Sequence, residues 1–378
     1  MLARVSMSDS PTAAACILDT GVTQGHPLLA PALKPSDCQS VREEWGSNDP
    51  HGHGTEMVGL SLYGNLVDVL ATSGPIQLEH CLESVKIYNE NDPNPPHLYG
   101  EVTIRGVQLA EQAAPHRHRA IGMAVTASDE EKGQPSTWSA AIDSLTSGYH
   151  DDKRRLLLIS AGNTPDAHWH EHPSSCQSSS VQDPGQSWNA LTVGASTQFA
   201  SLPVERYPDW LLVASKGDVS PFSRTSSNWQ RPWPLKPEIV VEGGNCAIDP
   251  VDGKGRTVDE LSLLTTYRTP TVRAFSLSAM TSAATALAVR YAAILQARYP
   301  DFWPETIRAL LVHSAEWTDA MKKHFLPLNT REQKEKLLRY CGYGNPDFTR
   351  ACWSATNHLT LVAQDSFQPY KKEESTYK

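Results

Sequence analysis

The chain has 378 residues, 39% of them hydrophobic, and a net charge of −9. It can bury a large core, in one large α/β domain or two ordinary ones. The negative charge argues against nucleic acid or an anionic membrane as a partner. No apolar run approaches the roughly 20 residues of a spanning helix, and the N-terminus lacks the apolar stretch of a secretory signal. Seven scattered cysteines without a CxxC pair favour reduced thiols, and so a cytoplasmic location.

Apolar runs and amphipathic stretches alternate along the chain. Short apolar runs predict buried strands at 14–19, 82–88, 120–125, 155–161, 190–196 and 239–244. Helices are predicted at 53–63, 101–114, 135–147, 304–317 and 332–340, with a long one starting at 281. This alternation predicts an α/β fold, a doubly wound and mostly parallel sheet with helices on both faces. We expect one main domain, residues 1–318, and a helical C-terminal extension with a polar tail, residues 319–378.

The first chemically informative residue is Asp19, at the end of the first apolar strand. In an open α/β sheet, functional groups collect beyond the carboxyl ends of the strands. Leu18-Asp19-Thr20-Gly21 also fits the signature of aspartic peptidases. A two-lobed aspartic peptidase needs a second such triplet, and the sequence contains none. We therefore disfavour that interpretation.

Three further residues follow Asp19 in motifs of their own. His53 starts a helical stretch in HGHGTEMVG, whereas His51 is interpreted as a loop histidine. Asn163 ends the strand LLLISAGN, where its amide could act as a hydrogen-bond donor. Ser282 opens a helix rich in small residues, and a helix N-terminus favours negative charge beside a nucleophile. A carboxylate, a base, an amide donor and a nucleophile are the parts of an acyl-transfer site.

The stretches CILDTGVTQGHPLL, DPHGHGTEMVG, LLLISAGN and SAMTSAATALA, in this order, resemble the motifs of subtilisin-like serine peptidases (subtilases, peptidase family S8). The resemblance covers roughly residues 14–318. It implies a subtilisin-like fold and a serine endopeptidase that acts through an acyl-enzyme. Asp19 would orient His53, His53 would take the proton from Ser282, and Asn163 would donate to the oxyanion.

The sequence departs from the family pattern beside the nucleophile and in the substrate segment. Met280 stands where subtilases have a glycine, and such a glycine serves backbone conformation or leaves room for substrate. The resemblance assigns peptide binding to Gly162 and to Ala124, Val125 and Thr126, where the family usually has Ser-Leu-Gly. Thr126 in place of glycine is expected to crowd the first specificity pocket.

Three other groups of residues have two interpretations each. Asp129, Glu130 and Glu131 could favour basic substrate side chains, but a solvated acidic loop is preferred. The triplet His168, His170 and His172, with Cys176 nearby, has the composition of a metal site, but a polar surface loop is preferred. Subtilases often bind structural calcium, yet no Asp-rich loop here can be assigned to it. We predict no metal ligand and no cofactor.

Phrases such as GHPLL, HGTEMVGL and YGNPD are most similar to the catalytic core of larger bacterial subtilases with flanking domains. Some of these are encoded beside an AAA ATPase. The expected partners are therefore a peptide or protein substrate and such an ATPase or flanking domain. Only 18 residues precede Asp19, and we therefore expect no folding propeptide of the kind found in secreted subtilases. Three interpretations of the chain stay open: an intracellular peptidase that needs a partner, a trimmed core, or a degenerate copy. The alternative function is a catalytically impaired subtilase that acts as a peptide-binding or assembly module.

Overall fold

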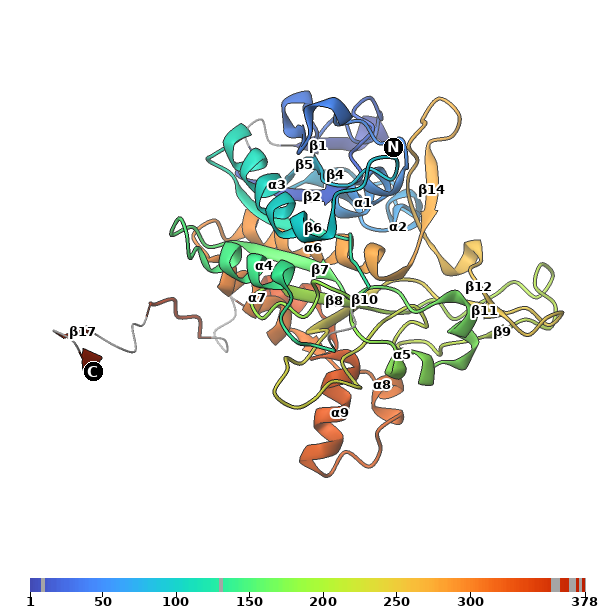
Figure 1. Ribbon diagram of the computed structural model, residues 1–378. Helices are drawn as coiled ribbons and strands as arrows, with labels where there is room; N and C mark the ends of the chain where they lie inside the picture. Colours follow the sequence, from blue (N-terminus) through green and yellow to red (C-terminus); the bar gives the residue numbers. More distant parts are fainter. Residues whose placement is uncertain (8–10, 129–131, 355–360, 367–371, 374–375, 378) are drawn as a thin grey trace.

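A seven-stranded parallel sheet forms the centre of the molecule in the computed structural model (Figure 1). The structure describes residues 1–7, 11–128, 132–354, 361–366, 372–373 and 376–377. The strands lie in the order β10 (Ile239–Glu242), β8 (Leu191–Ser196), β7 (Leu156–Ser160), β6 (His118–Met123), β2 (Ala13–Asp19), β5 (Cys81–Lys86) and β3 (Cys38–Ser40). The predicted doubly wound α/β fold is confirmed, and the edge strand β3 is an addition to it.

Helices cover both faces of this sheet because its strands alternate their buried side chains. Ile17 of β2 faces a core made with α1 (His53–Tyr63), α6 (Met280–Arg298) and α7 (Pro304–His313). Leu18, one residue later, faces a second core made with α3 (Tyr99–Ala113) and α4 (Thr137–Ser147). Alternate residues of a strand point to opposite faces. The continuous apolar strands in the sequence therefore correspond to a sheet that is buried on both sides.

The strand order of the central sheet reverses beside β2. The chain passes from β2 to β3 and β5 on one side, then returns to form β6 on the other. Asp19, the last residue of β2, pairs with Lys86 at the end of β5. Ligands of open α/β sheets bind at such a reversal, outside the carboxyl ends of the strands. The topology thus points to the surroundings of Asp19 as the functional edge.

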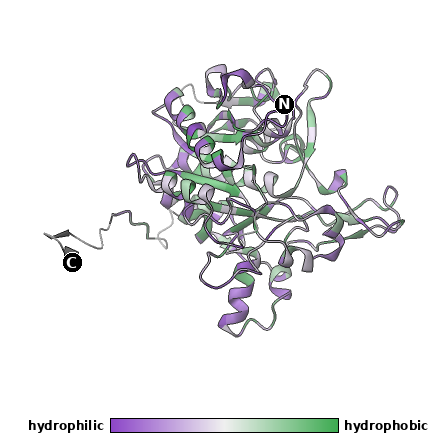
Figure 2. Cartoon of the chain, viewed as in Figure 1, coloured by the Kyte–Doolittle hydropathy of each residue, from purple (hydrophilic) through white to green (hydrophobic). Residues whose placement is uncertain are grey.

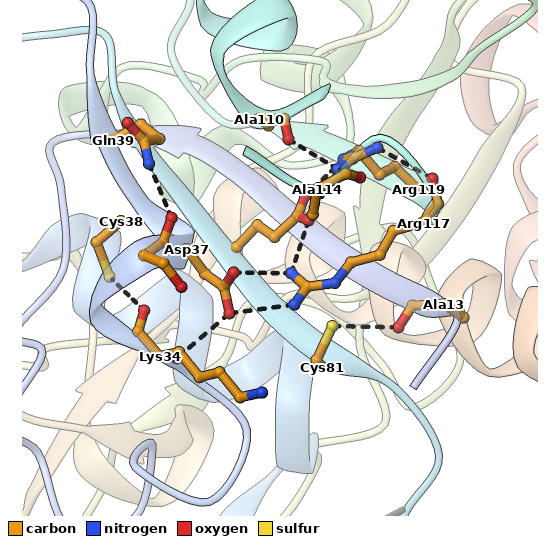
Figure 3. Close-up of polar contacts among 12 residues, drawn as sticks. Ala13, Lys34, Asp37, Cys38, Gln39, Cys81, Ala110, Ala114, Arg117 and Arg119 are labelled. Carbon is orange, nitrogen blue, oxygen red and sulfur yellow. Dashed lines mark hydrogen bonds and ion pairs between the residues drawn. The ribbon is translucent and has the colours of Figure 1, made fainter. Parts of the chain in front are cut away.

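A buried ion-pair network ties the opposite, amino-terminal end of these strands together (Figure 3). Arg117 donates to Asp37 and Glu83, both at 2.9 Å, and Arg119 donates to Glu83 at 2.6 Å. All four side chains are at least nine-tenths buried. Arg119 also donates to the carbonyl oxygen of Ala114, just after α3. The network joins β5, β6 and the C-terminal end of α3.

Smaller elements surround the central sheet. The remaining helices are α2 (Leu66–Ala71), α5 (Ser174–Ser178), α8 (Asp319–Lys323), α9 (Arg331–Cys341) and α10 (Phe348–Ser354), with 3-10 turns at η1 (Leu2–Arg4), η2 (Pro35–Asp37), η3 (Glu43–Trp45), η4 (Pro96–Leu98), η5 (Asp166–Glu171) and η6 (Asp259–Leu261). The small sheets pair β1 (Val5–Met7) with β4 (Ile76–Leu78), β13 (Leu263–Thr266) with β14 (Phe275–Ser278), β15 (Ala315–Glu316) with β16 (Asn345–Pro346), β17 (Lys372–Glu373) with β18 (Thr376–Tyr377), and β11 (Ala247–Ile248) with β9 (Leu211–Leu212) and β12 (Gly255–Arg256).

The C-terminal helices α8 and α9 pack against the main body through a small apolar cluster. Met321 of α8 and Tyr340 of α9 are fully buried there, against Cys176 of α5 and Val240 of β10. Figure 2 shows mostly hydrophilic residues on the rest of α9, whereas hydrophobic residues concentrate in the central strands. Residues 367–371, 374–375 and 378 of the polar tail lie outside the described residues. No helix in the described part of the chain is long and apolar enough to cross a membrane.

Candidate active site

Asp19 and His53 are joined by a direct hydrogen bond at the functional edge of the sheet. His53 Nδ1 lies 2.8 Å from Asp19 Oδ1, which also accepts from Thr20 N. The Asp19 side chain is fully buried, and that of His53 is 28% exposed. A Cβ on Gly54 would lie 2.2 Å from the Gly21 carbonyl oxygen, so a glycine is required for α1 to start this close to the Asp19 turn. The carboxylate fixes the orientation of the ring through Nδ1, so Nε2 is the ring nitrogen that remains for proton transfer.

The environment makes His53 an unusually strong base. Burial alone lowers the pKa of His53, but the Asp19 charge and hydrogen bond raise it to about 9. Glu56, one turn further along α1, adds to this effect. Burial raises the pKa of Glu56 itself, and a hydrogen bond from Ser276 opposes that rise. A base with a pKa near or above the working pH accepts a proton readily once it is neutral.

Asp49 organises the turn before His53, and the sequence analysis did not identify it. One of its carboxylate oxygens accepts from Thr20 Oγ1 at 2.9 Å and Gly52 N at 2.8 Å. The other accepts from Thr55 N at 2.8 Å and Thr55 Oγ1 at 2.7 Å. Asp49 therefore ties the turn after β2 to the first turn of α1. The sequence signal that could have revealed it is the Asp-Pro-X-Gly stretch, which is typical of a turn stabilised by an aspartate.

Asn163 lies against the residue that precedes Ser282. Its side-chain oxygen accepts from Thr281 N at 3.1 Å and from Thr281 Oγ1 at 2.6 Å. Thr281 Oγ1 is also 2.8 Å from Ser160 Oγ at the end of β7. With its oxygen occupied in this way, the Asn163 amide nitrogen is left to donate elsewhere. The family pattern assigns that nitrogen to the oxyanion.

Ser282 stands in the first turn of α6, which has no side-chain cap at its N-terminus. The residue is 7% exposed, and its hydroxyl makes no hydrogen bond within the described part of the chain. The uncapped N–H groups and the positive helix end favour negative charge at this point. Ser276 of β14 donates to Glu56 at 2.7 Å, so the strand that leads into α6 contacts the first turns of α1. No hydrogen bond joins Ser282 to His53, which is common before substrate binds.

Met280 retains the backbone conformation of the glycine that it replaces. Its φ is +76°, a region that disfavours side chains other than glycine. Its N–H donates to the Gly243 carbonyl oxygen at 2.6 Å, and its side chain packs against a cluster containing Trp169 and Phe222. Because Thr281 still reaches Asn163, the methionine has not displaced the amide. The backbone at position 280 therefore has the conformation that favours glycine, and Met280 is strained in it.

The predicted substrate segment continues directly from β6. Ala124, Val125 and Thr126 are half-buried and follow Met123, the last residue of the strand. Gly162 lies between Ala161 and Asn163 and has a φ of +85°. Residues 129–131, the acidic stretch, lie outside the described residues. The segment and Gly162 thus lie at the carboxyl ends of the neighbouring strands β6 and β7.

The other candidate residues lie away from this arrangement or at its rim. His51 is exposed, with its ring centroid 6.2 Å from that of His53. His168 and His170 are exposed on the 3-10 turn η5, whereas His172 turns inward to within 3.3 Å of Tyr340 Oη. Among the described residues, no group of three or more His, Cys, Asp or Glu is arranged to hold a metal ion. All seven cysteines are buried and free.

Comparison with known proteins decides the family. The model of the subtilase family matches residues 12–344. The chain belongs to the subtilase family. It is therefore a member of a family of serine proteases, and the matched range contains Asp19, His53, Asn163 and Ser282. The uncharacterized protein y4bN of Sinorhizobium fredii is 26% identical over 247 residues, which cover 62% of this chain and 55% of that protein. This subtilase thus spans about half the length of that relative.

Solved structures share the fold of this subtilase at low sequence identity. The epidermin leader peptide processing serine protease EpiP of Staphylococcus aureus matches with a TM-score of 0.57 and 16% identity over 92% of this chain and 77% of that one. A lanthipeptide protease gives 0.56 and 16% over 91% and 88%, respectively. The prenylagaramide maturation protease PagA gives 0.52 and 17% over 91% and 93%. At these identities the likeness establishes the subtilisin-like fold.

Proposed function

We propose that this subtilase is a serine endopeptidase that hydrolyses peptide bonds through an acyl-enzyme, with Asp19, His53 and Ser282 as its triad. The observation that carries the proposal is the 2.8 Å hydrogen bond between Asp19 and His53 in a chain of this family. It supplies a basic, oriented imidazole at the carboxyl edge of the sheet. The unbonded Ser282 hydroxyl at the start of α6 is the matching nucleophile.

In the proposed reaction, neutral His53 takes the proton of the Ser282 hydroxyl as its oxygen attacks the scissile carbonyl carbon. The Asn163 amide and the Ser282 N–H donate to the resulting oxyanion. His53 then gives its proton to the leaving amine, and water releases the acyl group by the same steps. Asp19 remains ionised throughout and stabilises the protonated ring. No metal or cofactor enters these steps.

The substrate of the proposed reaction is an extended peptide. The segment Ala124, Val125 and Thr126 continues a strand beyond the sheet, where a peptide can pair through main-chain hydrogen bonds. Two of the solved structures with this fold are named as peptide-processing or maturation proteases. The seven free thiols fit a reducing compartment, and on that ground we propose a cytoplasmic location. An AAA ATPase or flanking domain remains the proposed partner.

The second candidate function is an impaired subtilase that binds peptides without cutting them. Met280 favours it, because this residue holds a strained φ of +76° two positions before the nucleophile. Under this alternative, the parent binds peptides but does not hydrolyse them, and Met280→Gly restores hydrolysis. We prefer the active enzyme, because the carboxylate, the base, the amide and the serine are all retained.

The experiment is hydrolysis of denatured casein by the purified parent, Ser282→Ala and Met280→Gly, with folding of each checked by circular dichroism. Cleavage by the parent and none by Ser282→Ala supports the endopeptidase and ends the second candidate. Cleavage by Met280→Gly alone supports the second candidate. Equal cleavage by the parent and Ser282→Ala contradicts the proposed nucleophile.

A further inference from the structure

We infer that the side chains of Gln182 and Thr126 fill the primary specificity pocket, so that the peptidase cuts after glycine, alanine or serine. The inference rests on the proposed endopeptidase function. It concerns the substrate residue that supplies the scissile carbonyl, here called the acyl-side residue. Its carbonyl oxygen must reach Asn163, and its side chain must therefore enter the space beside Gly162 and the 124–126 segment.

The side chain of Gln182 occupies the space that a side chain on Gly162 would need. A Cβ built on Gly162 would lie 2.2 Å from Gln182 Oε1 and 2.6 Å from its Cγ. The glutamine side chain therefore rests against the α-carbon of the residue that precedes Asn163. Its backbone is fixed there as well, because Gln182 N donates to the Ala161 carbonyl oxygen at 3.0 Å. Side chain and main chain together place Gln182 beside the candidate oxyanion donor.

Thr126, in the substrate segment, contacts the same glutamine side chain. Its hydroxyl donates to Gln182 Oε1 at 2.9 Å and so joins the substrate segment to the segment that carries Gln182. One residue later, Ala127 N donates to the Asp183 carbonyl oxygen at 2.8 Å, so the two segments are also joined by their main chains. A glycine at position 126 would leave the glutamine without this partner. The Thr126–Gln182 pair thus spans the pocket.

The segment that carries Gln182 is held from behind. Val181 is fully buried in a cluster with Ala161 and Trp229, and its N–H donates to the Thr225 carbonyl oxygen at 3.0 Å. Gln182 can therefore clear the pocket only by rotating its side chain and breaking the bond from Thr126. A methyl or hydroxymethyl group needs no such movement, whereas a leucine or phenylalanine side chain does. Overfilling a packed site is unfavourable, and one extra methylene alone changes discrimination by roughly 10-fold or more.

The inference is tested on a peptide library made by digesting a cell lysate with trypsin, which supplies every acyl-side residue except lysine and arginine in many contexts. Mass spectrometry identifies the bonds cut by the parent, by Thr126→Gly/Gln182→Ala, and by Gln108→Ala. Gln108 is exposed on α3 and is the matched control. One efficiently cut peptide is then synthesised with alanine or phenylalanine on the acyl side, and kcat/KM is measured for both.

We expect the parent and Gln108→Ala to cut after glycine, alanine and serine, with kcat/KM at least about tenfold higher for alanine than for phenylalanine. The double variant should accept leucine and phenylalanine and lose or reverse that ratio. Frequent cutting after large residues by the parent, or an unchanged ratio in the double variant, overturns the inference but leaves the endopeptidase intact. No cutting by any of these proteins, together with no labelling of Ser282 by a fluorophosphonate, overturns the proposed function itself.

Discussion

Met280 offers a direct measure of the backbone strain next to the nucleophile. Its φ of +76° is a conformation in which side chains cost roughly 1–2 kcal/mol relative to glycine. Glycine loses about 0.5–1 kcal/mol of this advantage through the greater freedom of the unfolded chain. The methionine side chain also contributes packing against the Trp169 and Phe222 cluster. A comparison of glycine with methionine alone therefore mixes two effects of opposite sign.

Two substitutions at the same position separate these effects. Met280→Ala removes the packing and keeps the strained φ, whereas Met280→Gly removes both. We therefore expect Met280→Gly to be more stable than Met280→Ala by about 1 kcal/mol. Ala283, fully buried in the regular part of α6, is the control position, because Ala283→Gly should cost about 1 kcal/mol or more. Exchange of alanine for glycine thus has opposite signs three residues apart.

The assay is equilibrium unfolding in urea at neutral pH, followed by tryptophan fluorescence, with the parent measured alongside. The midpoints and slopes of the three variants give their free energies of unfolding. If Met280→Gly is less stable than Met280→Ala, position 280 carries no strain of the kind described. The reasoning about the missing glycine would then be wrong.

Three further predictions concern the base, the amide donor and the buried ion pairs. Because only neutral His53 accepts a proton, kcat/KM should rise with pH to a plateau, with the midpoint of the rise near pH 9. In Asp19→Asn that midpoint should lie below pH 7. The pKa of His53 is higher in the folded than in the unfolded chain, so protonated His53 stabilises the fold fully below about pH 6.5 and this stabilisation is lost toward pH 9. The free energy of unfolding in urea should therefore fall by up to about 3 kcal/mol over this range in the parent, but not in Asp19→Asn. Asn163→Asp can still accept from Thr281 but cannot donate, so kcat should fall by about 10²–10³-fold with a parent-like melting temperature; kcat within a few-fold of the parent would exclude Asn163 as an oxyanion donor. Arg117→Met leaves Asp37 without an arginine partner and Glu83 with one fewer, so the free energy of unfolding in urea should fall by about 3–5 kcal/mol. The control Arg105→Met, at an exposed position, should change that free energy by less than about 0.5 kcal/mol, and similar losses for both variants would refute the role of the network.

The sequence allowed the central fold to be predicted because its strands are short, apolar and separated by amphipathic helices. The strand ending at Asp19 and the helix starting at His53 were predicted with these same end points. The predicted helix 304–317 instead ends at His313, and Ala315–Glu316 pairs as a short strand with Asn345–Pro346. A pairing partner 29 to 31 residues away leaves no signal in the local sequence. The hairpin β13–β14 was not predicted either, because the eight residues between its strands form a loop longer than the short turns that mark a hairpin in a sequence.

The candidate site shows the same division between local and distant information. Asp19, His53, Asn163 and Ser282 stand in recognisable motifs, so each could be named before the structure. The carboxylate of Asp49 and the amide of Gln182 act through contacts with Thr20 and Thr126, which are 29 and 56 residues away. Only the folded chain brings such pairs together. The sequence led us to expect that Thr126 crowds the first specificity pocket, but it did not identify Gln182, which accepts the hydrogen bond from Thr126.

Covalent labelling of the purified chain by a fluorophosphonate, with the modified residue identified by mass spectrometry, shows directly whether Ser282 is an activated nucleophile. We expect one phosphonyl group per chain on Ser282, faster labelling as the pH rises toward 9, and no labelling of Ser282→Ala. A folded parent that remains unlabelled, or that is labelled at another residue, would contradict the account and would favour the peptide-binding alternative.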